Sequence, residues 1–240
     1  MSLPILKSPI YSLTLPSNGK IVKYTSFLVR DEKILASALM NGETSTIAAT
    51  LKEIINNCTF GKLDVDKLSS FDVEYIFLQL RSKSRGNIVE LVYTCKNEVA
   101  GGVCDEVNNF SIDLEKINVD MKSAPSLKIM LTDKVGLQMK YPTLDNVLDI
   151  QVQLDNKNIS AIYDKMGDFV ECVFEGERIE DKFTNEEFSN WLGTLDRNQF
   201  KKIEDFFQNI PTVKSCSQVC CKKCGHKDEI VLKELSSFLA

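Results

Sequence analysis

The stretch CCKKCGHKDEI, residues 220–230, determines how the end of this chain is joined to its middle. Cys221 and Cys224 are separated by two residues and are followed by Gly225. This pattern is typical of a tight turn that directs both thiolates to the same side, as a tetrahedral zinc ion requires. The turn supplies only half of such a site, so the sequence predicts two further ligands elsewhere.

A second cysteine pair lies in the middle of the chain. Cys95 and Cys104 are separated by eight residues, and alternating apolar residues on both sides indicate a loop that joins two strands. In both motifs, apolar side chains recur six and eight residues after the second cysteine. The repeated plan predicts a zinc-ribbon-like pair of knuckles with a closed structural zinc site. Its predicted metal ligands are Cys95, Cys104, Cys221 and Cys224.

Other interpretations of the cysteines stay open. Cys216, Cys220 or His226 could replace one of the four ligands, and all the thiols could be reduced and partly buried. Redox chemistry requires a CxxC that opens a helix after a strand, whereas residues 226–235 have the pattern of a strand. Cys58 and Cys172 lie in apolar, helical contexts, which predicts that both are core residues.

Composition narrows the class of protein. With 240 residues and 43% hydrophobic content, the chain can bury a sizeable core. A net charge of −5 disfavours nucleic acid as a partner. The sequence contains no apolar run of the roughly eighteen residues that a membrane span needs, and the N-terminus lacks the apolar core of a signal peptide. We therefore expect a cytoplasmic protein without a membrane partner, in which thiolate or metal chemistry is favoured over disulfides.

Local patterns predict the α+β fold class. The first thirty residues read as a β-hairpin around PSNG at 16–19, followed by helices at about 31–40 and 44–57. The segment 69–86 predicts a helix that is apolar around most of its circumference and therefore buried, with Gly86 as its end. Antiparallel strands are expected at 87–94, 109–120 and 127–141, and residues 145–174 read as mostly helical. Thr184 with Glu187 predicts a capping box, and one more helix ends before Pro211.

A soft boundary near residue 121 predicts two parts. Residues 1–120 form an N-terminal α+β part with the first cysteine knuckle. Residues 121–240 contribute a strand hairpin, a helical part and the CxxC knuckle, which packs back on the first part. The alternative is that the whole chain forms one compact unit.

The sequence carries no catalytic constellation. His226 is the single histidine and lies among the cysteines, which leaves no histidine for a catalytic dyad elsewhere. No phosphate-binding loop or GxGxxG motif is present, and the acidic pairs fall in the first turns of predicted helices. The basic run at 81–85 ends a predicted helix, where cations are stabilised by the helix dipole. We therefore expect that the protein is not an enzyme.

Long phrases in this chain resemble the T4-type bacteriophage baseplate hub assembly proteins. They include residues 3–35, TFGKLD at 59–64, FDVEYIFLQLRSKSRG at 71–86, the cysteine loop before IDLEKINV, and residues 196–239. The resemblance implies a late viral protein of the infected host cytoplasm that builds the hub of a contractile-tail baseplate. The resemblance also implies that the four cysteines of the family correspond to Cys95, Cys104, Cys221 and Cys224. It implies no active-site residue. The extra Cys216 and Cys220, and the Leu239-Ala240 ending, depart from the family pattern.

Three functions follow as hypotheses. The first is a chaperone-like assembly factor that binds phage baseplate hub proteins through apolar surface. The second is a permanent structural subunit of the baseplate hub, retained in the virion tail. The third, a zinc-ribbon adapter for nucleic acid, is disfavoured by the acidic composition.

Overall fold

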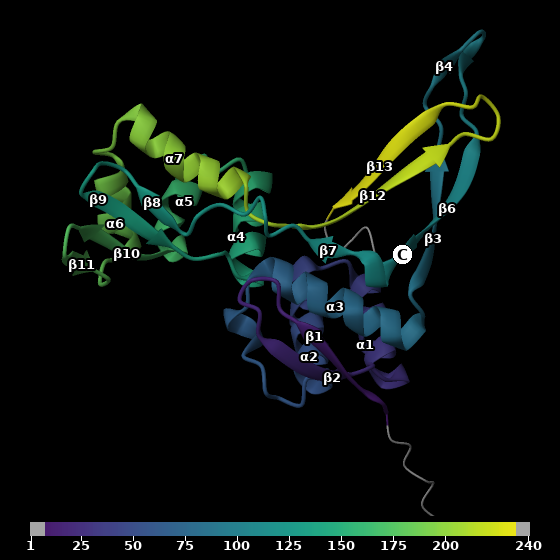
Figure 1. The fold of residues 1–240 in the computed structure, drawn as a ribbon, viewed down its shortest axis with the longest axis horizontal. Helices are drawn as coiled ribbons and strands as arrows, with labels where there is room; N and C mark the ends of the chain where they lie inside the picture. Colours follow the sequence, from purple (N-terminus) through teal and green to yellow (C-terminus); the bar gives the residue numbers. More distant parts are fainter. Residues whose placement is uncertain (1–7, 234–240) are drawn as a thin grey trace, which may run out of the picture.

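The structure is a computed structural model that describes residues 8–233. Within this range seven α-helices combine with antiparallel sheets, which confirms the predicted α+β class. Figure 1 shows a helical unit near the N-terminus, a lobe of sheet and helices, and two long hairpins that project side by side. Residues 239–240, where the sequence departs from the family pattern, lie outside the described residues. Among helices of residues 8–233, none combines the length and apolar character of a membrane span.

The N-terminal unit packs a two-stranded hairpin against three helices. Strands β1 (Ile10–Thr14) and β2 (Ile21–Thr25) pair antiparallel and alternate buried with exposed residues. Gly42 adopts a left-handed φ of 70° and ends the first helix, close to the end expected near residue 40. The helices are α1 (Val29–Asn41), α2 (Thr44–Cys58) and α3 (Ser70–Arg85), with a 3-10 turn, η1 (Val65–Lys67), before α3.

Helix α3 is the central element of the fold, because it packs on two sides. Val73, Ile76 and Phe77 are fully buried in the core of the N-terminal unit. Leu78 faces another way and is fully buried against the first of the two long hairpins. Apolar residues surround nearly the whole circumference of the segment 69–86, and the helix that it forms is accordingly buried on two sides.

Two hairpins form the projecting part. The first, named here the arm, pairs β3 (Ile88–Thr94) with β6 (Val107–Asp113) and carries β4 (Glu98–Val99) and β5 (Gly102–Val103) at its tip. The second, the C-terminal hairpin, pairs β12 (Val213–Cys220) with β13 (Lys227–Lys233). The 3-10 turn η2 (Leu114–Lys116) and the short strand β7 (Asn118–Val119), which pairs with β12, lead from the arm toward the rest of the chain. The two hairpins run alongside each other in Figure 1 and share a small core.

The remaining lobe is a four-stranded antiparallel sheet with helices. Its strand order is β11-β10-β9-β8. A cluster of buried apolar residues, which includes Leu137, Phe169 and Phe206, joins the sheet to helices α6 and α7. Elements of the lobe are β8 (Lys128–Met130), β9 (Val135–Met139), α4 (Leu144–Asp155), α5 (Ile159–Asp164), η3 (Met166–Phe169), β10 (Val170–Glu175), β11 (Arg178–Glu180), α6 (Asn185–Leu192) and α7 (Arg197–Gln208).

Several local predictions were wrong. The expected helical stretch 145–174 ends at residue 169, and Val170–Glu175 is the strand β10, whose partner β9 is distant in sequence. Cys172 is accordingly half-buried on a strand rather than in a helical core, while Cys58 is buried in α2 as expected. The expected strand 109–120 is interrupted by η2, and β12 was not foreseen.

The division of the chain near residue 121 stays a prediction. Contacts do cross it: Leu144 packs against the N-terminal core, and Lys52 Nζ lies 2.6 Å from Asp145 Oδ2. The N–H of Ser70 also donates to the carbonyl of Pro142 at 2.9 Å.

Candidate metal centre

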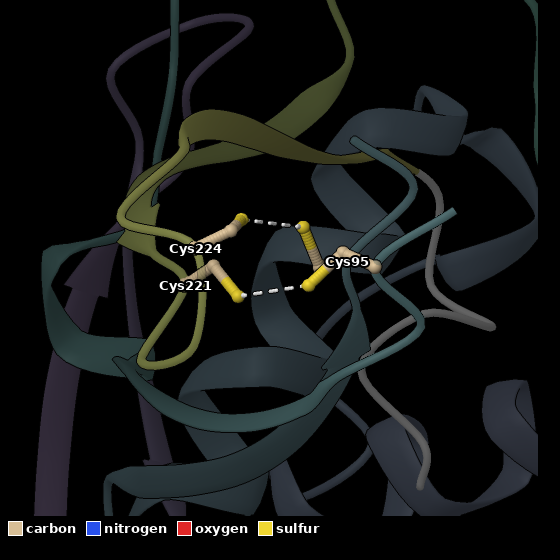
Figure 2. Close-up of side chains that lie close together, drawn as sticks. Cys95, Cys221 and Cys224 are labelled. Atoms are coloured by element: carbon tan, nitrogen blue, oxygen red, sulfur yellow. Dashed lines mark hydrogen bonds between the residues drawn. The ribbon is translucent and has the colours of Figure 1, made fainter. Parts of the chain in front are cut away.

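Four sulfur atoms meet between the tips of the arm and the C-terminal hairpin. Cys95 Sγ lies 3.7 Å from Cys224 Sγ, and Cys104 Sγ lies 3.8 Å from Cys221 Sγ. All four sulfurs lie within 4.8 Å of one another. Figure 2 shows Cys224 directed across the space between the hairpins toward Cys95, with Cys221 beside Cys224 on the same turn. The four residues expected from the sequence are thus brought together, and they are named here the four-cysteine cluster.

The arm builds its half of the cluster with a hydrogen-bonded turn. The N–H of Cys95 donates to the carbonyl of Glu106 at 2.9 Å, and the N–H of Asp105 donates to the carbonyl of Cys95 at 3.0 Å. Asp105 has a φ of 50°, in the left-handed region that few non-glycine residues occupy. The left-handed residue turns the chain directly after Cys104, so both cysteines face the same side.

The C-terminal hairpin repeats this turn. The N–H of Cys221 donates to the carbonyl of His226 at 2.8 Å, and the N–H of Gly225 donates to the carbonyl of Cys221 at 2.9 Å. Gly225 has a φ of 71° and stands where Asp105 stands in the arm, directly after the second cysteine. The two turns therefore share their hydrogen-bond pattern although their spacers differ in length.

The longer spacer of the arm forms its own small hairpin. Strands β4 and β5 pair through Glu98–Val103 and Val99–Gly102, and the N–H of Cys104 donates to the carbonyl of Asn97 at 2.9 Å. The additional residues therefore extend outward as an insertion, which leaves the cysteine geometry intact.

The sulfur separations fit a metal ion better than they fit disulfides. A tetrahedral ion with Zn–S bonds of about 2.3 Å places its sulfurs about 3.8 Å apart. The short separations of 3.7 and 3.8 Å agree with that value. A disulfide needs about 2.05 Å, and all eight cysteines of the chain are free thiols. With four thiolates around it, such an ion has no open position for water or substrate.

A buried asparagine joins the two hairpins at the cluster. Asn108 is 1% exposed, and its Nδ2 lies 3.6 Å from Cys221 Sγ and donates to the carbonyl of Glu106 at 3.0 Å. Its Oδ1 accepts from the N–H of Lys222 at 2.9 Å. Asn108 thus satisfies its amide fully while holding Cys221, as residues behind metal ligands do. Asn108 was not predicted as part of the site, since it lies one position before the expected strand 109–120; in the structure it occupies a buried position of β6.

The hairpins also meet through a second polar contact. The hydroxyl of Tyr93 donates to Asp228 Oδ2 at 2.6 Å, and the Tyr93 ring packs against the cluster. Lys223 Nζ donates to the carbonyl of Cys104 at 3.4 Å. The surroundings of the cluster are therefore polar and specific rather than aliphatic.

Backbone N–H groups and burial set the pKa values of the thiols. The N–H of Cys224 is the largest influence on Cys221, and with the N–H of Lys223 it outweighs burial and lowers the pKa of Cys221 to about 6. For Cys104, the N–H of Glu106 lowers the pKa, but burial and the neighbouring thiols together raise it to about 11. Without a metal, the cluster therefore holds Cys221 as a thiolate at neutral pH while Cys104 stays protonated.

Alternative ligands lie outside the cluster. Cys216 and Cys220 are exposed on β12, and Cys220 Sγ donates to the carbonyl of Gly225 at 3.6 Å. His226 contributes its backbone carbonyl to the turn, and its ring is not among the grouped ligand atoms. Among residues 8–233, the four-cysteine cluster is the one group of three or more such side chains close enough to share a metal ion.

Comparison with known proteins identifies a family. A family model described as "T4 bacteriophage base plate protein" matches residues 8–240, which is nearly the whole chain. No curated protein and no solved structure matches the chain.

Proposed function

This chain belongs to the T4 bacteriophage base plate protein family, and from that membership we propose a non-enzymatic assembly factor for the base plate hub. In this proposal the chain acts like a chaperone: it binds hub proteins in the infected host cell until they join one another. A base plate family favours a structural or assembly role over catalysis. Phage base plate proteins are accordingly the partners to expect.

The outer face of the arm carries this proposal. Val92 and Val107 are 67% and 57% exposed, and strand alternation places them on the face of the arm opposite its buried residues Val89 and Ile112. At the tip, Val99 and Val103 are also exposed. Aliphatic side chains that gather on the open face of a two-stranded sheet favour contact with another protein. A projecting arm can present this face without obstruction from the body of the molecule.

A structural zinc ion in the four-cysteine cluster supports the same proposal. The ion would be held by Cys95 and Cys104 of the arm and by Cys221 and Cys224 of the C-terminal hairpin, with Asn108 behind Cys221. When bound, zinc would supply a rigid link between the two hairpins and no chemistry on a substrate. The arm would then keep a fixed shape for binding, which lowers the entropy cost of association.

A permanent subunit of the base plate hub is the second candidate. The family description favours it, because it names a base plate protein without reference to assembly. Both candidates use the same surfaces, and they differ in whether the chain stays in the finished particle.

Quantitative mass spectrometry of purified tails separates the two candidates. The assembly-factor proposal expects the chain in hub complexes from infected cells and only trace amounts in finished tails. Copies in fixed proportion to the other base plate proteins of the tail would overturn it in favour of the permanent subunit.

Substitutions on the arm test the binding surface in the same cells. Val92→Lys should reduce the recovery of hub proteins with the tagged chain, because a charge replaces an exposed aliphatic group at the centre of the face. Val152→Lys is the matched control, since Val152 is 52% exposed on α4, away from the arm. Equal losses for both variants would contradict a role for the arm.

A further inference from the structure

A hollow lies on the N-terminal unit, and Figure 1 shows this unit at a distance from the tip of the arm. The hollow has a volume of about 510 Å³ and lies between strand β2 and the turn that follows α2. Its floor is apolar, with buried Val22 and Leu63. Ile21 and Phe60 at its sides are 69% and 47% exposed, so the hollow offers apolar contacts that no described part of the chain covers.

The charged side chains at the rim of this hollow are all positive. Lys20, Lys23 and Lys62 line it, and none of the described lining residues is acidic. All three lysines are exposed, and none forms an ion pair with a residue of the range 8–233. The chain as a whole has a net charge of −5, so this concentration of positive charge is local. Such a rim attracts carboxylates and repels basic segments.

The backbone holds Phe60 in a conformation that an aromatic residue rarely adopts. Its φ is 63°, and the following Gly61 has a φ of 64°. The N–H of Gly61 donates to the carbonyl of Asn56 at 2.9 Å, and the hydroxyl of Thr59 donates to the carbonyl of Ile55 at 2.8 Å. These bonds impose the left-handed turn, and glycine would satisfy it without strain. An exposed phenylalanine at such a position indicates a use for its ring.

We propose that this hollow, named here the lysine pocket, binds an acidic protein segment that inserts an apolar side chain beside Phe60. The carboxylates of the segment meet Lys20, Lys23 and Lys62 at the rim, and its apolar side chain covers Ile21 and the floor. Three lysines around an aliphatic floor fit a peptide better than nucleic acid, which needs a longer basic track. The inference rests on the proposed function, since it gives the chemistry of a partner that an assembly factor would hold.

Fluorescence anisotropy with the purified full chain tests the pocket directly. The probe is a short labelled peptide that alternates glutamate and leucine. Matched peptides replace either glutamate by glutamine or leucine by serine, and a labelled oligothymidylate represents nucleic acid. We expect the glutamate–leucine peptide to bind, with an affinity that falls as salt rises, and both matched peptides to bind more weakly. Tighter binding of the oligothymidylate than of the peptide would overturn the proposal.

Two variants locate the binding. Replacement of Lys20, Lys23 and Lys62 by glutamine should lower the affinity for the peptide by about tenfold, because three exposed ion pairs are lost. The control replaces three other exposed lysines, Lys33, Lys134 and Lys201, and changes the net charge equally. An equal loss in both triple variants would show an effect of net charge alone and would refute the pocket.

Phe60→Gly separates binding from stability. Glycine relieves the left-handed backbone, so the melting temperature should stay within a few degrees of the parent while peptide affinity falls. Unchanged affinity in this variant would exclude Phe60 from the site and overturn the proposal. The peptide assay uses no phage component, and the arm substitutions leave the lysine pocket intact. Failure of the pocket is therefore distinguishable from failure of the assembly-factor proposal.

Discussion

Cys221 and Cys220 are adjacent in sequence but have opposite environments, and this contrast gives a sharp test of the metal centre. Cys221 is buried in the four-cysteine cluster, whereas Cys220 is exposed on β12. Cys221→Ser should abolish stable metal binding, because a neutral hydroxyl is a poor zinc ligand and the cluster would lose its tetrahedral set. Cys220→Ser should leave metal content unchanged and serves as the matched control.

The length of chain that the metal closes sets the size of the effect. Cys104 and Cys221, whose sulfurs approach to 3.8 Å, are 117 positions apart. A cross-link that closes a loop of that length is worth up to about 5 kcal/mol in the chain-entropy description. For a protein of this size, that amount corresponds to a fall of roughly 10–20 °C in the melting temperature. Partial zinc binding by the unfolded CxxC would reduce the effect, so the figure is an upper bound.

Metal analysis and thermal unfolding together decide the outcome. Protein purified without chelator should contain about one zinc ion per chain, and it should lose both the zinc and the added thermal stability when treated with a strong chelator. The Cys221→Ser variant should match the chelated parent, and Cys220→Ser should match the untreated parent. Less than roughly a tenth of a metal ion per chain in the parent would refute the zinc hypothesis.

Three further expectations follow from individual side chains. Asn108→Leu should weaken zinc binding by about ten- to a hundredfold in a chelator competition, because it removes the amide behind Cys221; wild-type affinity would show that the amide does not support the ligand. Gly136→Ala should destabilise the protein by about 1–3 kcal/mol in urea, since a Cβ would lie 2.4 Å from the Phe174 ring and 2.6 Å from the Ile129 carbonyl. Gly193→Ala, whose nearest contact is 3.3 Å, is its control and should be close to neutral. In metal-free protein the pKa of Cys221 is lowered from 9.0 to about 6. The Cys221 thiolate therefore adds its full share to the free energy of unfolding above pH 9, and this share is lost as the pH falls through about 6. Iodoacetamide at pH 7 should therefore label Cys221 before Cys104, whose pKa is about 11, and equal rates measured by mass spectrometry would contradict this order.

Local chemistry predicted the ends of several helices well. Gly86 ends α3 where the sequence indicated, and Thr184 with Glu187 forms the expected capping box of α6 in the other lobe. These signals lie within a few residues of the feature they control, so no tertiary information is needed. The prediction failed at Val170–Glu175, where pairing with β9 rather than local preference makes a strand.

The candidate metal centre was foreseen through its spacing rather than its surroundings. Equal offsets from the second cysteine to the following apolar residues revealed two related turns, and the structure shows that both use the same hydrogen bonds. The role of Asn108 could not be predicted, because it depends on how two hairpins far apart in sequence align. For the same reason, the lysine pocket has no sequence signature: β2 and the Thr59–Leu63 turn meet only in the folded chain.

The ends of the two hairpins share little apolar surface. At their bases, Val89, Ile112 and Val213 share a buried core with α3. At their tips, the packed residues are the four cysteines and Tyr93, joined by a few polar contacts. A small contact of this kind offsets little of the entropy of fixing two long hairpins, and a structural zinc ion in the cluster would add to it. The exposed face of Val92 and Val107 lies on the same strands, so its shape depends on the tips staying joined. Zinc content and binding of hub proteins should therefore fall together, although the cluster itself contacts no partner in the proposed function.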